Sequence, residues 1–246
     1  MSFAWLTERP IAHRGWHGAG RPENSLAAAR AAIERGFAIE CDIRRSADGE
    51  AFVFHDATLD RLTPLHGRFG DLDAARLRET ALAESSERIP TLAALLAAIA
   101  GRVPLICEIK SGFDGDLTLA RRASEIAAGY DGPLAFKSFD PQVIAYLRAE
   151  RCPRPLGIVA EAVYDDHYFA ALSPAQKRDC TALLHIERTR PDFLSWHVDD
   201  LPHATPTLFC ALGRKPVMAW TVRRPEQWAL ARQFADQAVF EGAVAP

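Results

Sequence analysis

Eight short apolar runs alternate with helix-patterned segments from one end of the chain to the other, and no other feature of the sequence restricts the fold as much. We expect strands at Pro10–Arg14, Phe37–Ile43, Val103–Lys110, Pro133–Lys137, Pro155–Ala160, Phe193–Val198, Pro216–Val222 and Ala238–Glu241. The helix candidates are Ser25–Arg35, Leu92–Ala100, Leu117–Ala128, Pro141–Arg148, Pro174–Thr181, Leu201–Leu212 and Pro225–Ala235. This alternation predicts a parallel sheet with crossover helices, and eight such units predict a closed (β/α)8 barrel, or TIM barrel.

A doubly wound open sheet is the alternative α/β architecture, but no glycine-rich dinucleotide-binding turn follows the first strand. The 246 residues suit one domain, because α/β barrels of this length are common as single domains. Asn24 or Ser25 can cap the first helix, and Gly36 stands where a glycine that ends a helix is expected. We therefore predict a single TIM-barrel domain over residues 1–246.

The segment from Ala51 to Pro90 interrupts the alternation. We expect an extra short strand at Ala51–His55, followed by a polar, helix-poor stretch. An insertion after the second strand lies on a β-to-α connection, and these connections form the C-terminal mouth of a barrel, where barrel enzymes carry their chemistry. The sequence therefore predicts a small insertion over that mouth.

Charge and cysteine usage restrict the partners and the compartment. The formal net charge is −3, with neither a basic patch for nucleic acid nor a polybasic cluster for anionic membranes. The five cysteines are an odd number without a C-x-x-C pair, which favours a reducing compartment. Neither a secretory signal nor a run of about 18 apolar residues is present. We expect a soluble cytoplasmic protein without a membrane span, whose oligomeric state the sequence leaves open.

Charged residues within predicted buried strands indicate where the chemistry lies. In I-E-C-D-I, side chains alternate between the two faces of the strand, so Glu40 and Asp42 share one face. The same parity in I-C-E-I-K places Glu108 and Lys110 together. Three neighbouring carboxylates repel one another unless positive charge lies between them, and one Mg²⁺ or Ca²⁺ with oxygen ligands would supply it. An internal salt-bridge network with Lys110 and Arg14 is the alternative.

Two histidines end predicted strands, His13 in I-A-H-R-G and His55 in F-V-F-H-D. Imidazoles titrate near neutral pH, so the pair can serve as general acid and general base. Metal ligation is the alternative, but hard cations prefer oxygen. Arg14 and Lys110 add positive charge, so the set favours a phosphate-bearing substrate, and phosphoryl transfer or diester cleavage over glycoside hydrolysis.

Nine short motifs follow one another along the chain: H-R-G at His13–Gly15, P-E-N-S at Pro22–Ser25, E-C-D at Glu40–Asp42, D-G-x-x-x-V-x-H-D from Asp48 to Asp56, L-D-R-L-T at Leu59–Thr63, I-P-T-L at Ile89–Leu92, E-I-K at Glu108–Lys110, K-S-F at Lys137–Phe139 and W-T-V at Trp220–Val222. With these motifs the chain resembles, over essentially its whole length, the glycerophosphodiester phosphodiesterase family in its compact bacterial form. One departure is the C-terminal A-V-F-E-G-A-V-A-P, where Glu241 stands in place of the family's T-D or T-N motif and the last barrel helix is expected to be missing.

The resemblance implies that His13 and His55 are the acid and base, and that Glu40, Asp42 and Glu108 hold one Mg²⁺ or Ca²⁺. The implied reaction is hydrolysis of a glycerophosphodiester to sn-glycerol 3-phosphate and an alcohol. In the implied route, the glycerol 2-hydroxyl attacks phosphorus, and water then opens the cyclic phosphate.

The resemblance also implies that Arg14 and Lys110 contact the phosphate and that Glu23 and Asn24 line or support the site. Trp220 is expected to form an apolar wall for the glycerol or alcohol, with plain core packing as the alternative. Two other functions remain open: a lysophospholipase D-type phosphodiesterase and a non-catalytic phosphodiester-binding barrel.

Overall fold

The computed structural model describes residues 3–242. Residues 243–246, the end of the C-terminal segment that differs from the family motif, lie outside the described part. The strands are β1 (Ile11–Ala12), β2 (Ala38–Arg45), β3 (Ala51–Val53), β4 (Leu105–Ile109), β5 (Leu134–Ser138), β6 (Leu156–Ala160), β7 (Phe193–His197), β8 (Val217–Val222) and β9 (Gln237–Phe240). The α-helices are α1 (Leu26–Glu34), α2 (Ala74–Glu79), α3 (Leu92–Ile99), α4 (Thr118–Ala128), α5 (Pro141–Ala149), α6 (Pro174–Thr181), α7 (Ile186–Thr189), α8 (Ala204–Gly213) and α9 (Pro225–Phe234). Every strand and helix expected from the sequence is present.

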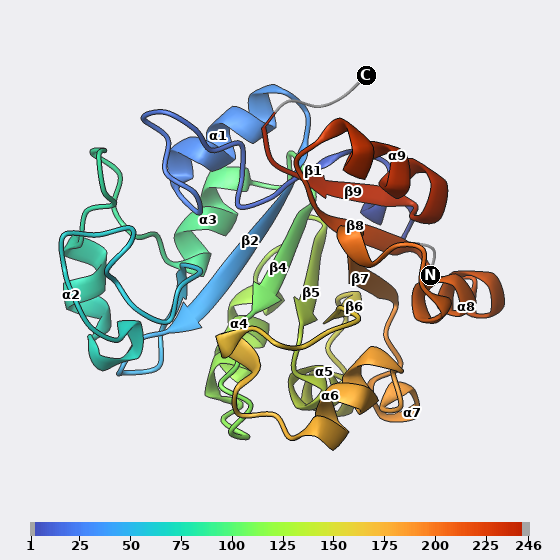
Figure 1. Cartoon of the computed structure of the whole chain (residues 1–246). Helices are drawn as coiled ribbons and strands as arrows, with labels where there is room; N and C mark the ends of the chain where they lie inside the picture. The colour runs from blue at the N-terminus through green and yellow to red at the C-terminus, as the bar shows by residue number, and fades with distance from the viewer. Residues whose placement is uncertain (1–2, 243–246) are drawn as a thin grey trace. The chain divides into compact units, whose positions relative to one another are not determined.

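The sheet follows the order β1-β9-β8-β7-β6-β5-β4-β2-β3, and β1 pairs in addition with β2, so the order closes on itself. The strand β3 runs antiparallel to β2, whereas β2 is parallel to both β1 and β4. The fold is therefore the predicted eight-stranded parallel barrel with helices between its strands, plus one extra strand (Figure 1). Within residues 3–242, no helix combines the length and apolar character needed to cross a membrane.

The chain divides into two compact units. The N-terminal unit comprises Ile11–Lys110 and Leu117–Leu134. The C-terminal unit comprises the described residues of Met1–Pro10, Ser111–Asp116 and Ala135–Pro246.

The strand β2 lies beside β4 in the N-terminal unit, and the helices α1 and α4 pack against it (Figure 1). Its register places Asp42 opposite Glu108 on β4. On the antiparallel side, Ile43 lies opposite Val53 of β3. All residues of β2 up to Ile43 are buried, so the acidic side chains on it lie inside the protein.

Local sequence signals fix the helix ends of this unit. The hydroxyl of Ser25 caps α1 by accepting a hydrogen bond from Ala28 N at 3.0 Å, as the sequence indicated. Gly36 follows the helix with a φ of +69°, a left-handed conformation that glycine adopts without steric strain. The chain can therefore reverse within a few residues and enter β2.

The inserted segment departs from the prediction in two respects. The extra strand ends at Val53 rather than His55, and the stretch expected to be poor in helix contains α2. This helix has only six residues, too few to show a helical period, and Asp73 caps it by accepting from Arg76 N. The segment also has its own apolar cluster, formed by Phe52, Phe54, Leu59, Phe69, Ala74, Leu77, Leu82 and Ile89. The segment is therefore packed around its own core.

In the C-terminal unit, β6, β7, β8 and β9 are consecutive parallel neighbours. The closest packing between β6 and β7 is at Gly157, which lies opposite Phe193 in the register. A Cβ on Gly157 would lie 2.3 Å from two atoms of the fully buried Phe193 ring. Only glycine therefore leaves room for this ring.

The change Gly157→Ala should reduce the free energy of unfolding by about 1–3 kcal/mol, because the Phe193 ring must move within a packed core. Urea unfolding measures the change. The control is Gly213→Ala at the exposed end of α8, where the nearest atom is 4.0 Å from the new Cβ and the stability should be unchanged or slightly higher. Equal stability of the two variants would mean that the ring relocates without strain.

Candidate active site

Five chemically distinctive side chains of the N-terminal unit lie on, or closely follow, three parallel strands and one antiparallel strand. His13 directly follows β1, Glu40 and Asp42 lie on β2, Glu108 lies on β4, and His55 comes two residues after β3. In parallel strands of a barrel, the carboxyl ends meet on one face. Side chains that are far apart in the sequence are thereby gathered in one region of the unit.

Three carboxylates share one buried position. Glu40, Asp42 and Glu108 are 0%, 1% and 4% exposed. Each offers one oxygen atom, and the three atoms lie within 4.8 Å of one another. Residues 3–242 contain one such cluster of metal-spaced ligands, and this is it. The parity argument from the sequence thus placed the three residues together.

Two basic side chains compensate the charge of Asp42. The Lys110 ammonium lies 2.8 Å from Asp42 Oδ1 and also donates to Glu108, while Arg14 Nε lies 3.2 Å from Asp42 Oδ2. Burial by itself would raise the pKa of Asp42, but Lys110, assisted by His55 and Arg14, holds that pKa well below its usual value. Asp42 is therefore ionised near neutral pH.

Asn24 fixes the orientation of Asp42. Its amide Nδ2 donates to Asp42 Oδ2 at 3.0 Å, and its Oδ1 accepts from Asp42 N at 3.2 Å. Both residues are buried. A two-point contact of this kind leaves the carboxylate little rotational freedom.

The turn after β1 brings His13 and Arg14 to the carboxylates. His13 Nε2 is 3.8 Å from Glu40 Oε2, and Arg14 N donates to the same oxygen at 3.2 Å. Gly15 follows with a φ of +76°, and a Cβ at this position would lie 2.9 Å from the backbone carbon of Ala28. The glycine of H-R-G is therefore required by the close approach of this turn to α1.

His55 has a carboxylate partner of its own. Its Nδ1 lies 2.8 Å from Asp56 Oδ1, and its backbone carbonyl accepts from Arg44 Nε at 2.6 Å. An ionised carboxylate accepts hydrogen bonds and cannot donate, so it favours the proton on Nδ1 and leaves Nε2 as the basic nitrogen of the neutral ring. The His55 side chain is 32% exposed and can reach a ligand.

Arg61 connects the carboxylates of Asp56 and Glu23, a role that the sequence analysis missed. It forms paired hydrogen bonds of 2.7 and 2.9 Å to Asp56, and of 2.8 and 2.8 Å to Glu23. Glu23 in turn accepts from Arg14 Nη1 at 2.7 Å. The L-D-R-L-T motif contained Arg61, but its spacing alone does not show that the side chain returns to Asp56 and reaches across to Glu23.

These contacts lower the pKa of both carboxylates. For Asp56, burial would raise the pKa, but hydrogen bonds from His55 and Arg61 lower it well below the usual value. For Glu23, burial is likewise outweighed by Arg61 and Arg14, so its pKa is lowered too. Both groups are anionic near neutral pH, and the Arg61 guanidinium is held between them.

Trp220, the remaining residue singled out from the sequence, belongs to the C-terminal unit on β8. Its indole Nε1 donates to Ser195 O at 3.0 Å. The ring meets Phe139 and His197 edge to face, with centroid separations of 5.5 and 4.9 Å. Trp220 is half-buried in this aromatic group, so it serves packing and still exposes part of its ring.

The N-terminal unit thus combines an oxygen-rich acidic cluster, two imidazoles and two basic side chains. Hard divalent cations bind carboxylate oxygens, and imidazoles transfer protons near neutral pH. Arginine and lysine bind phosphate oxygens. Such a combination can act on a phosphoryl compound.

Comparison with known proteins agrees with this chemistry. The model of the Glycerophosphoryl diester phosphodiesterase family matches residues 13–241. The chain is similar to glycerophosphodiester phosphodiesterase 1 of Bos taurus, with 42% identity over 92 residues, 33% of this chain and 27% of that protein. The Mus musculus protein of the same name is 34% identical over 150 residues, 56% of this chain and 44% of that protein. The matches therefore span less than half the length of these relatives.

Solved structures share the fold over nearly the whole chain. An Oleispira antarctica phosphodiesterase, in complex with the product sn-glycerol-3-phosphate, has a TM-score of 0.77 and 25% identity, covering 96% of this chain and 93% of that one. A glycerophosphodiester phosphodiesterase from Thermotoga maritima has a TM-score of 0.72 and 24% identity, covering 95% and 94%. The barrel and its strand order are thus those of these proteins.

The change Arg61→Gln should reduce the free energy of unfolding by about 1 kcal/mol near pH 7, and by clearly less near pH 2. Because the folded-state pKa values of Asp56 and Glu23 are lowered, their stabilisation is fully present above the unfolded values of 3.8 and 4.5. It is lost as the pH falls from there through the folded values. Urea unfolding at several pH values measures the difference from the unmodified chain.

The matched control is Arg30→Gln. Arg30 is about as exposed as Arg61, at 53% against 48%, but makes a single ion pair, with Glu87 at 3.1 Å. Its loss should change stability by less than about 0.5 kcal/mol at either pH. A difference between Arg61→Gln and the unmodified chain that is as large near pH 2 as near pH 7 would contradict the ion-pair interpretation.

Proposed function

Because the chain belongs to the glycerophosphoryl diester phosphodiesterase family, we propose that it hydrolyses glycerophosphodiesters to sn-glycerol 3-phosphate and an alcohol. One observation carries the proposal: His13 and His55 accompany the carboxylate cluster of Glu40, Asp42 and Glu108 in a single compact unit. Proton transfer and phosphate binding are the two requirements of diester hydrolysis, and this set can meet both.

Glu40, Asp42 and Glu108 would hold one divalent cation, Mg²⁺ or Ca²⁺. The donor set fits such an ion, since all three groups offer carboxylate oxygen within 4.8 Å and Asp42 is ionised. The competing interpretation is the ion pairs of Lys110 and Arg14, but these bring two positive charges to three carboxylates. A bound cation would supply neutralisation of the charge that develops on the phosphate oxygens.

The two histidines would move the protons. One imidazole takes the proton of the glycerol 2-hydroxyl as its oxygen bonds to phosphorus, and the other protonates the alcohol oxygen as its bond to phosphorus breaks. Water then opens the cyclic phosphate by the reverse transfers, which restores both rings. For His55, the Asp56 contact at 2.8 Å supports this role by fixing the proton on Nδ1.

The basic residues and their neighbours would position the substrate. Arg14 and Lys110 are the candidates for binding the phosphate. Both already form ion pairs with Asp42. Glu23 supports Arg14 through the 2.7 Å contact. Trp220 is the candidate apolar contact for the glycerol or alcohol portion. The odd number of cysteines supports the cytoplasm as the proposed location.

The decisive experiment measures sn-glycerol 3-phosphate released from glycerophosphocholine and glycerophosphoethanolamine by the purified chain. Release should stop with excess chelator and return when Mg²⁺ or Ca²⁺ is added. Glu108→Gln should weaken metal binding, so its activity should recover in part at high metal concentration. Unaltered metal affinity in this variant would remove Glu108 from the ligand set. Activity on lysophospholipids alone would replace the proposal with a lysophospholipase D.

Replacement of His13 or His55 by Ala should lower kcat by roughly 10²–10⁴-fold without loss of folding. The matched control is His66→Ala, because His66 also has a carboxylate partner, Asp60, with Nδ1 and Oδ1 3.0 Å apart, yet its side chain is 83% exposed. That variant should keep full activity. Unchanged turnover in either of the first two variants would remove that histidine from the reaction.

A further inference from the structure

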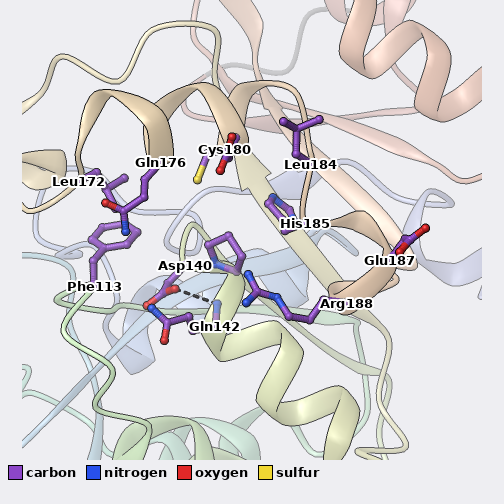
Figure 2. A pocket seen from close by; sticks show the side chains of 12 residues that line it. Phe113, Asp140, Gln142, Leu172, Gln176, Cys180, Leu184, His185, Glu187 and Arg188 are labelled. Carbon is purple, nitrogen blue, oxygen red and sulfur yellow. Dashed lines mark hydrogen bonds between the residues drawn. The ribbon is translucent and has the colours of Figure 1, made fainter.

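A cavity of about 310 Å³ lies in the C-terminal unit, between the start of α5 and the helices α6 and α7 (Figure 2). Four of its lining side chains are buried, those of Asp140, Leu172, Cys180 and His185. In Figure 2, Phe113 and Leu172 lie on one side of the cavity, and His185 and Arg188 lie on the other. The proposed hydrolysis uses none of these residues.

The hydrogen bonds of His185 determine its tautomer. The hydroxyl of Thr189 donates its one proton to the backbone carbonyl of His185, with Oγ1 and O 3.2 Å apart. The same Oγ1 lies 3.1 Å from His185 Nδ1, and while its proton is given to the carbonyl it accepts there, which favours the tautomer with the proton on Nδ1. Burial, followed by the charge of Arg188, lowers the pKa of His185 to about 4, so the ring is neutral near pH 7.

His185 Nε2 is consequently a hydrogen-bond acceptor, and it is buried without a partner among the described residues. Buried polar atoms are nearly always hydrogen-bonded, so an unsatisfied acceptor in a cavity wall points to a ligand that donates to it. At the rim, Leu184 is 70% exposed, which leaves this wall room to adjust around a bound molecule.

A second acceptor lies at the base of the cavity. The Asp140 carboxylate accepts from Ser111 Oγ at 2.6 Å and from Gln142 N at 2.8 Å. Each carboxylate oxygen has two acceptor sites, so Asp140 can accept further bonds. Burial, followed by the charges of Asp140 and Asp179, raises the pKa of Cys180 to about 11. The thiol therefore stays protonated, and covalent chemistry by a thiolate is not expected.

Charged side chains of both signs line the cavity, Arg188 on one hand and Asp140, Asp179 and Glu187 on the other, so neither a simple cation nor a simple anion matches the whole site. The positive charge of Arg188, which lowers the pKa of His185, would repel an ammonium group there. Asp140 and Asp179 act on Cys180 and would repel an anion. Metal binding is not supported either, because the one metal-spaced cluster within residues 3–242 is the carboxylate cluster of the N-terminal unit.

We propose that this cavity binds a small neutral polyol, of a size between glycerol and a hexose. A hydroxyl group both donates and accepts, so adjacent hydroxyls can donate to His185 Nε2 and Asp140 while accepting from Arg188. The carbon skeleton would lie against Phe113 and Leu172. Walls that are apolar, with a few converging polar groups, are typical of small-molecule sites.

Nitrogen-15 NMR of the histidine side chains, together with calorimetry, tests the proposal on the whole chain. Before ligand is added, His185 should show the proton on Nδ1 and an unprotonated Nε2. Glycerol or myo-inositol should shift the Nε2 resonance, whereas ethanolamine and inorganic phosphate should not. The variant His185→Phe identifies the resonance and should raise the Kd of the polyol by about fivefold to tenfold.

Gln142 provides a matched pair of variants that does not alter the buried wall. Its side chain is exposed at the second position of α5. Gln142→Trp should fill the cavity and abolish polyol binding, whereas Gln142→Ala should retain binding within about threefold. The proposal is overturned by any one of these results: a proton on Nε2 in the absence of ligand, no response to either polyol, a response to the charged probes instead, or undiminished binding by Gln142→Trp.

Discussion

The burial of three carboxylates within 4.8 Å of one another is the constraint around which the N-terminal unit is arranged. Like charges in a poorly solvated position repel, so each must be protonated, paired or shared with a cation. Lys110 and Arg14 compensate Asp42, Lys110 also pairs with Glu108, and Asn24 orients Asp42 with two hydrogen bonds. The same arrangement concentrates positive charge beside oxygen ligands, which is the environment that a phosphate requires.

Arg61 extends the same charge compensation outward to a histidine. It holds Asp56 and Glu23, which hold His55 and Arg14 respectively. Alternating positive and negative charges thereby join Arg14 in the turn after β1 and Glu23 in the loop before α1 to the inserted segment. The insertion thus has two structural roles: its apolar cluster stabilises its own fold, and its polar edge orients one imidazole.

Periodic patterns predicted the elements well, and short or irregular features were missed for physical reasons. The eight barrel strands were recognisable because buried parallel strands read as apolar runs. The helix α2 was missed because six residues are stabilised by the Asp73 cap and by burial of Leu77, not by a repeat that a sequence pattern can reveal. Arg61 was missed because a surface arginine has no pattern that identifies its partners.

The sequence by itself determined the closed α/β architecture, the side-chain parity that groups Glu40 with Asp42, and the residue types suited to phosphodiester chemistry. These follow from local periodicity and composition, which need no long-range information. Only the tertiary structure decided that Lys110 bridges two carboxylates, that Arg61 reaches Glu23, and that a cavity lies beside His185. Each of these depends on distances between segments remote in the sequence, which are set by packing and not by local preference.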